Sequence, residues 1–122
     1  MILFCATSAR VKLYVRESGS DALPAEAGAA SAVAVCRIAW AEAVAATARR
    51  ARDVPADAAA LDAARQRLRD HWPHYVVVEV TQALVERAGE YADTFALRGY
   101  DSVQLAAARM VQEASREELR FA

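Results

Sequence analysis

Proline and glycine are scarce in this sequence, with three and four residues respectively in a chain of 122. Disordered and low-complexity chains are rich in these residues and poor in apolar ones, whereas 56% of this chain is hydrophobic and 25% is charged. A domain of this size buries roughly two thirds of its unfolded surface. The sequence therefore predicts one compact domain over residues 1–122 and excludes two independent domains.

Cysteine is also rare, since only Cys5 and Cys36 are present and neither belongs to a Cys-x-x-Cys motif. Each lies in a short apolar run of the kind that forms a buried strand. A free thiol in such a place packs as a small apolar side chain. A disulfide or a shared metal is the less favoured alternative, because neither cysteine has a pattern of basic neighbours.

Long apolar segments are missing as well. No stretch approaches the roughly 18 apolar residues of a transmembrane helix. The first residues lack the basic start and the long apolar run of a signal peptide. We therefore expect a cytoplasmic protein that does not contact the membrane.

An excess of positive charge is absent too, because the net charge is −1 and Lys12 is the only lysine. Such a balance supplies no long-range attraction for nucleic acid. Any contact with RNA must then come from a local group of arginines or from a bound metal ion.

Short apolar runs alternate with amphipathic stretches along the chain, and this order is typical of a three-layer α/β fold with a central parallel sheet flanked by helices. The runs predict strands at residues 2–5, 31–35 and 75–80 and from residue 119 onward. The amphipathic stretches predict a helix capped by Thr7 or Ser8, a short one near Pro24, and longer ones over 37–52, from Asp57 to about 72, after Thr81 and over 102–115.

The helix that ends near Trp72 is predicted to bury Leu61 and Leu68, which are seven residues apart on one face. His71 and His74 follow its end and are expected on the surface, because they have no acidic or thiol partner at metal-binding spacing. Its solvent side is predicted to carry Arg65, Arg67, Arg69 and Asp70.

Three positions fall where functional groups of α/β folds gather, at the carboxyl ends of the strands. Ala6 follows the first strand, Glu42 lies one turn into the helix after the second, and Asp101 opens the helix before the fourth. We expect the three positions to converge on one edge of the sheet. Taken singly, Glu42 reads as a solvated helix residue and Asp101 as a helix N-cap.

Three segments carry a more specific pattern. Residues 7–17 begin Thr-Ser-Ala-Arg-Val-Lys-Leu-Tyr-Val, residues 38–43 read Ile-Ala-Trp-Ala-Glu-Ala, and residues 97–108 read Leu-Arg-Gly-Tyr-Asp-Ser-Val-Gln-Leu-Ala-Ala-Ala. Together they resemble the PIN-domain ribonucleases of the VapC toxin type, and the resemblance spans nearly the whole chain. The third segment is the most specific, because the family has Leu-Arg/Ser-x-x-Asp-Ala-x-x-Leu-Ala-x-Ala there.

The resemblance implies a PIN-like domain that acts as a Mg²⁺- or Mn²⁺-dependent endoribonuclease and as the toxin of a type II toxin–antitoxin system. It also implies three partners, namely an RNA substrate, a cognate antitoxin protein and a second copy of the chain in a homodimer. Glu42 and Asp101 match metal-binding acids of the family. Thr7 and Ser8 are candidate supporting residues, and Arg98 is either a phosphate contact or a plain surface arginine.

Two of the four positions that the family has at its metal site, the first aspartate and a fourth residue that is an acid or a hydroxyl, are not found in this sequence. Ala6 stands where the first aspartate belongs, and the fourth position would follow Ala122. Hard divalent cations need oxygen ligands, which a methyl group cannot supply. The resemblance therefore predicts a catalytically impaired nuclease, with a non-catalytic antitoxin- or RNA-binding protein of the same fold as the alternative. Natural loss and deliberate substitution of the aspartate explain Ala6 equally well.

Two further expectations follow from the resemblance. The apolar segment from Leu119 to Ala122 stops within a strand pattern, so we expect the natural product to continue with the last C-terminal elements of the family. A candidate surface for the antitoxin is formed by Val11, Tyr14, Val15 and Leu23, although Val11 and Val15 fit the internal core equally well.

Overall fold

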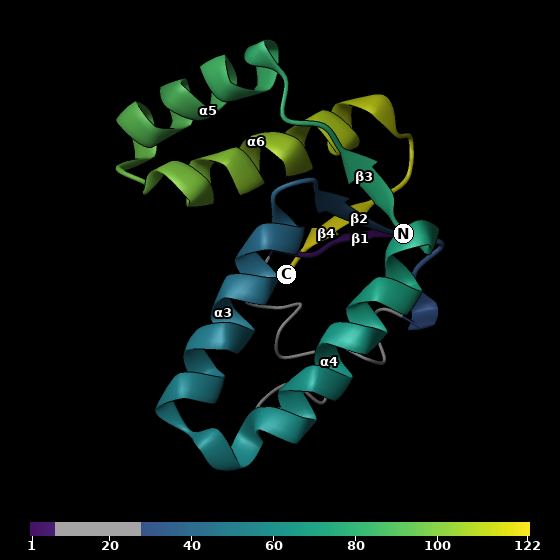
Figure 1. The fold of residues 1–122 in the computed structure, drawn as a ribbon. Coiled ribbons are helices and arrows are strands. Elements are labelled where there is room, and N and C mark those ends of the chain that lie inside the picture. The colour runs from purple at the N-terminus through teal and green to yellow at the C-terminus, as the bar shows by residue number, and fades with distance from the viewer. Residues whose placement is uncertain (7–27) are drawn as a thin grey trace.

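A parallel sheet with helices on both faces forms the structure, which is a computed structural model that describes residues 1–6 and 28–122 (Figure 1). The strands are β1 (Ile2–Phe4), β2 (Ala32–Cys36), β3 (Val76–Val78) and β4 (Leu119–Phe121), in the order β3-β2-β1-β4. The helices are α3 (Ala39–Asp53), α4 (Ala58–His71), α5 (Gln82–Phe95) and α6 (Gly99–Ala114), with short 3₁₀ turns at Pro55–Asp57 and Trp72–His74. The predicted three-layer α/β fold is confirmed.

Several expectations concern residues 7–27, which lie outside the described part of the chain. They are the helix capped by Thr7 or Ser8, the short helix near Pro24, and the surface of Val11, Tyr14, Val15 and Leu23. These expectations stay predictions.

The side chains of β1 alternate between two apolar layers, as the pleat of a strand requires. Ile2 and Phe4 pack in a cluster with residues of α5 and α6, whereas Leu3 and Cys5 pack in a second cluster on the opposite face. In Figure 1, α5 and α6 accordingly lie together above the sheet and α3 and α4 below it. Because both faces are covered, β1 needs an uninterrupted apolar sequence.

The two cysteines are buried free thiols, as predicted. Cys5 belongs to the cluster on the α3 side of the sheet and Cys36 to the cluster on the α6 side. They therefore face different layers, and each fills a place that a small apolar residue would otherwise occupy.

The α5–α6 layer is held by small residues and one large anchor. Ala106, Ala107 and Ala108 of α6 are buried against the sheet and α5, and Leu84 near the start of α5 has no exposed surface. Thr81 caps α5 as predicted, since its hydroxyl accepts a hydrogen bond of 3.2 Å from the Leu84 N–H. The Thr81 cap and the buried Leu84 side chain together fix the position at which α5 begins.

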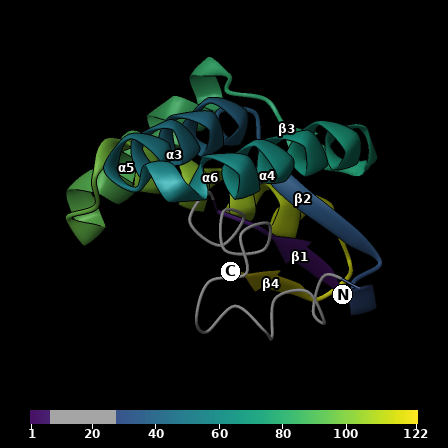
Figure 2. The same cartoon turned by 60° about the horizontal axis from the view of Figure 1, so that its bottom comes forward.

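The opposite layer is a hairpin of α3 and α4, which run side by side in Figure 2. Leu61 and Leu68 are buried in α4, as predicted, and Arg67, Arg69 and Asp70 are exposed. The prediction for Arg65 was wrong. Its guanidinium donates to the Thr47 hydroxyl at 2.8 Å and to the Val44 carbonyl at 3.3 Å, because Thr47 is buried in the hairpin interface and needs polar partners.

The strand β3 is shorter than the predicted strand over 75–80 and lies at the edge of the sheet. The Arg37 N–H donates to the Val78 carbonyl at 2.9 Å, and its guanidinium binds the Glu79 carboxylate. The hydrogen bond from the Arg37 guanidinium lowers the pKa of the Glu79 carboxyl group. The strand ends at Val78, and the chain continues to Thr81, the cap residue of α5.

Among the described residues, no helix is both long and apolar enough to cross a membrane.

We predict that Leu84→Ala lowers the free energy of unfolding by about 2–5 kcal/mol, because the removed atoms leave a cavity in a fully buried site. The neighbouring Val85 is 36% exposed, so Val85→Ala is a matched control that should cost less than about 1 kcal/mol. Urea denaturation measures both values. Equal losses for the two variants would contradict the packing described for α5.

A second prediction concerns Ala96, whose φ of 54° and ψ of 36° lie in the left-handed region at the C-cap of α5. Glycine adopts this conformation without the steric cost that a Cβ atom brings. We expect Ala96→Gly to raise the free energy of unfolding by about 1 kcal/mol, whereas Ala63→Gly on the exposed face of α4 should lower it by a similar amount. Loss of stability in both variants would contradict the backbone geometry at Ala96.

Candidate functional site

The N-terminal turn of α6 carries the first candidate residue, Asp101. The prediction that Asp101 is an N-cap was wrong, because α6 begins at Gly99 and Arg98 is the cap residue, with an extended backbone. The Ser102 hydroxyl donates to the Gly99 carbonyl at 2.6 Å and its N–H donates to the Arg98 carbonyl at 2.9 Å. Asp101 thus lies inside the first turn, where the positive end of the helix dipole favours an anionic side chain.

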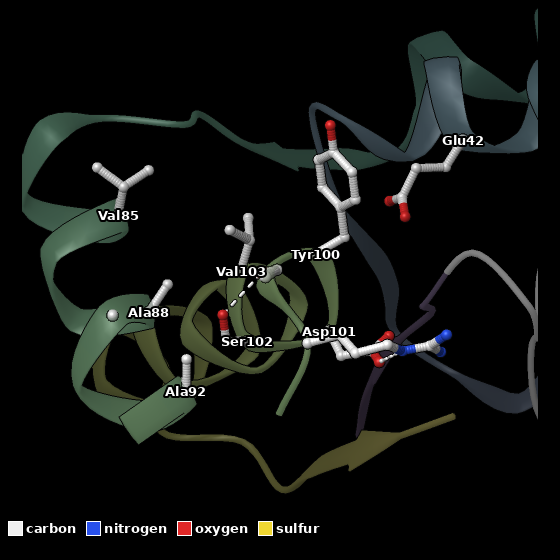
Figure 3. Close-up of a pocket in the computed structure, with 11 residues that line it drawn as sticks. Glu42, Val85, Ala88, Ala92, Tyr100, Asp101, Ser102 and Val103 are labelled. Atoms are coloured by element: carbon white, nitrogen blue, oxygen red, sulfur yellow. Dashed lines mark hydrogen bonds and ion pairs between the residues drawn. The ribbon is translucent and has the colours of Figure 1, made fainter. Parts of the chain in front are cut away.

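Asp101 and Glu42 both line a pocket of about 700 Å³ (Figure 3). One wall is the start of α6, and Glu42 enters from the first turn of α3. The second wall is α5, which contributes Val85, Ala88, Gly89 and Ala92. Two of the three predicted positions, Glu42 and Asp101, therefore line one pocket, although they are carried by helices on opposite faces of the sheet.

Asp101 is paired with Arg98, the predicted supporting residue, which also lines the pocket. Arg98 Nε donates to Asp101 Oδ2 at 3.0 Å, and the two side chains are 90% and 52% exposed. Exposed ion pairs of this kind contribute only about 0–1 kcal/mol. The guanidinium therefore neutralises the carboxylate but is readily exchanged for another cation.

Glu42 is half-buried and has a different kind of partner. Gln104 Nε2 donates to Glu42 Oε1 at 2.7 Å, and Gln104 itself is only 4% exposed. Gln104 was not predicted as a site residue. The sequence does carry a signal, because Gln104 is a long polar residue on a face of α6 that is otherwise small or apolar, one turn after Asp101.

Ala6 follows β1 directly at the carboxyl edge of the sheet. Its N–H donates to the Ala122 carbonyl at 2.8 Å, which ties it to the end of β4. Ala6 does not line the pocket. The other two supporting candidates at this edge, Thr7 and Ser8, lie outside the described residues.

The chemistry of the donors fits a divalent cation only in part. Carboxylate oxygens are the ligands that Mg²⁺ and Mn²⁺ prefer, and such ions are often held by one or two carboxylates with several waters. Over residues 1–6 and 28–122, however, no group of three or more acidic, histidine or cysteine side chains is placed to hold a metal ion. Glu42 and Asp101 are thus a donor pair of the right class, without a third protein ligand at position 6.

The other potential ligands do not extend this pair. His71, the last residue of α4, and His74, in the 3₁₀ turn that follows, are exposed, as predicted. Cys36 lies at the end of β2, where burial raises the pKa of its thiol and the negative charge of Glu42 raises it further. A thiol that stays protonated is a poor metal ligand.

Comparison with known proteins adds an independent finding to this geometry. No protein-family model matches the chain. Ribonuclease VapC45 of Mycobacterium tuberculosis strain CDC 1551 / Oshkosh is 34% identical to it over 110 residues, which cover 90% of this chain and 76% of that protein. Ribonuclease VapC49 of Mycobacterium tuberculosis strain ATCC 25618 / H37Rv matches with the same identity over the same shares.

Both relatives agree with the resemblance that the three sequence segments carry, and the fold agrees with it as well. Two of the positions that the resemblance assigns to metal-binding acids, Glu42 and Asp101, meet in one pocket. With relatives of this identity along nearly its whole length, the chain belongs to the VapC family of PIN-domain ribonuclease toxins.

Proposed function

We propose that this chain is a VapC-type endoribonuclease toxin whose metal site is reduced to Glu42 and Asp101, so that it cleaves RNA slowly. One observation carries the proposal, namely that both family acids line the same pocket while position 6 is an alanine. Membership of the VapC family supports RNA hydrolysis as the reaction. The presence of only two of the expected metal-binding residues supports slow cleavage.

In this proposal Glu42 and Asp101 hold a Mg²⁺ or Mn²⁺ ion through their carboxylate oxygens. The bound ion would supply an activated water and neutralise charge on the phosphodiester. The chain's own contribution is to place the two carboxylates from separate layers and to keep Arg98 beside them. Arg98, which is 90% exposed beside Asp101, would be available to bind an RNA phosphate.

The proposed partners follow from the same family membership. They are an RNA substrate, a cognate antitoxin and a second copy of the chain. The net charge of −1 does not attract RNA over a distance, so local contacts such as Arg98 must supply the binding. Ala6 favours a second candidate function, in which the chain keeps the fold and binds antitoxin or RNA without cleaving it.

We predict that Ala6→Asp raises the rate of RNA cleavage in Mn²⁺ by at least about 10- to 100-fold. Outer-shell partners of metal ligands already change activity by about this factor, and a ligand that contacts the ion should matter at least as much. Ala6→Asn is a matched control of the same size without the charge, and it should gain much less. Cleavage of a labelled RNA, with chelator and with Glu42→Ala as further controls, measures the effect.

Fast cleavage by the present chain that chelator and Glu42→Ala both abolish would overturn the proposed impairment. Absence of cleavage in the present chain and in Ala6→Asp, with RNA or antitoxin still bound, would favour the non-catalytic alternative.

A further prediction uses the repulsion between carboxylates. Ala6 does not itself line the pocket, but an aspartate there that reached Glu42 and Asp101 would raise the electrostatic energy of the metal-free site, and a divalent cation would remove that cost. We therefore expect Ala6→Asp to melt at a lower temperature than the present chain without metal and to gain more stability from Mn²⁺. Ala6→Asn should change neither value appreciably. Equal Mn²⁺-induced shifts in all three proteins would show that position 6 does not border a metal site.

A further inference from the structure

Gln104 is unusual among the buried residues of α6. It is 4% exposed, and its buried neighbours along the helix are Ser102 and the alanines at 106–108. A buried amide destabilises a fold unless its polar atoms find partners, whereas an apolar side chain of similar size would pack here without that requirement. A glutamine at this position therefore needs a specific reason.

One hydrogen-bond partner of Gln104 is the carboxylate of Glu42. The distance of 2.7 Å from Gln104 Nε2 to Glu42 Oε1 is that of a strong hydrogen bond to a charged acceptor. Glu42 lies on the first turn of α3, at the mouth of the pocket, and its position is shown in Figure 3. The amide thus reaches from a buried place in α6 to a carboxylate that is open to the pocket.

This hydrogen bond joins the two helical layers. The face of α6 packs with Ile2 and Phe4, whereas Ala39 at the start of α3 packs with Leu3 and Cys5 on the other face of β1. The contact between Gln104 and Glu42 therefore passes around the carboxyl edge of the sheet.

Gln104 also lies one turn after Asp101, on the same helix. Residues three apart on a helix lie close together on its surface. The first turns of α6 thus carry one of the two carboxylates directly and hold the other through an amide. Any shift of α6 therefore moves both Asp101 and the amide that holds Glu42.

An amide is chemically suited to this task. It donates a hydrogen bond without bringing a positive charge, so the carboxylate keeps the charge that attracts a cation. At Asp101 a guanidinium takes that place, since Arg98 Nε binds one oxygen of the carboxylate. The two acids of the pocket are thus bonded to different groups, Asp101 to an exposed guanidinium and Glu42 to a buried amide.

We infer that Gln104 is a positioning residue that fixes the orientation of the Glu42 carboxylate and its separation from Asp101 for binding of a divalent cation. The inference rests on the proposed function, because it assigns Glu42 and Asp101 to that cation. Gln104 itself does not touch the substrate or the ion. It acts through Glu42.

The test uses Ala6→Asp as the background and Mn²⁺ alone as the probe. Gln104→Met keeps the length of the side chain and removes the donor, and Gln112→Met is a matched control on the exposed side of the same helix. We expect Gln104→Met to weaken Mn²⁺ binding by about 10- to 100-fold, and Gln112→Met to leave it within about twofold. Electron paramagnetic resonance of free Mn²⁺ gives the dissociation constants.

A double-mutant cycle with Glu42→Gln separates positioning from packing. If Gln104 acts through the carboxylate, Gln104→Met has little further effect on Mn²⁺ binding once Glu42 is neutral. A purely structural role would instead lower the melting temperature and leave the affinity for Mn²⁺ unchanged. That second result, in a protein with intact near-ultraviolet circular dichroism, would overturn the inference.

A measurement without any change at position 104 covers the case in which Gln104→Met does not fold. In Ala6→Asp, the side-chain amide resonances of Gln104 should shift during a Mg²⁺ titration with the same saturation as the binding site, while those of Gln112 should not. Unchanged Gln104 resonances in a protein that does bind Mg²⁺ would overturn the positioning role alone. Failure of Ala6→Asp to bind either Mg²⁺ or Mn²⁺ would overturn both the proposed metal site and the positioning role of Gln104.

Discussion

The central constraint in this structure is that β1 has no face exposed to water. Its residues are buried on both sides and it is paired on both edges, with β2 and with β4. Every apolar layer must therefore be supplied by helices, and each helix must start or end at an edge of the sheet. The carboxyl edge then becomes the place where the start of α3 and the start of α6 meet. The pocket with Glu42 and Asp101 is a direct result of this arrangement.

Much of the fold could be predicted from the sequence, because its signals are local. The apolar runs at 2–5 and 31–35 and the amphipathic stretch over 37–52 need only periodicity and length to be recognised. Thr81 was recognised from residue type alone. The convergence of Glu42 and Asp101 also followed from one topological rule, namely that sites form at the carboxyl ends of parallel strands.

The missed features depend on contacts between segments that are distant in the sequence. Arg65 looks like a solvent residue until α4 packs on α3 and brings it to Thr47. Gln104 looks like any helix residue until two layers place it against Glu42. The start of α6 was predicted three residues too late, with Asp101 as the cap. The cap residue is Arg98, whose backbone is extended, and not the nearest acid. Helix boundaries and cross-layer hydrogen bonds are set by tertiary packing, which a single sequence does not display.

The alanines at 106–108 have a consequence for how firmly the site is held. An alanine has no side-chain torsion to order, so these three positions add no rotamer entropy cost to the docking of α6 on the sheet. Their Cβ atoms also leave little distance between the helix backbone and the sheet. At these positions the depth at which α6 approaches the sheet is therefore set by backbone and Cβ atoms, on the same helix that carries Asp101 and Gln104.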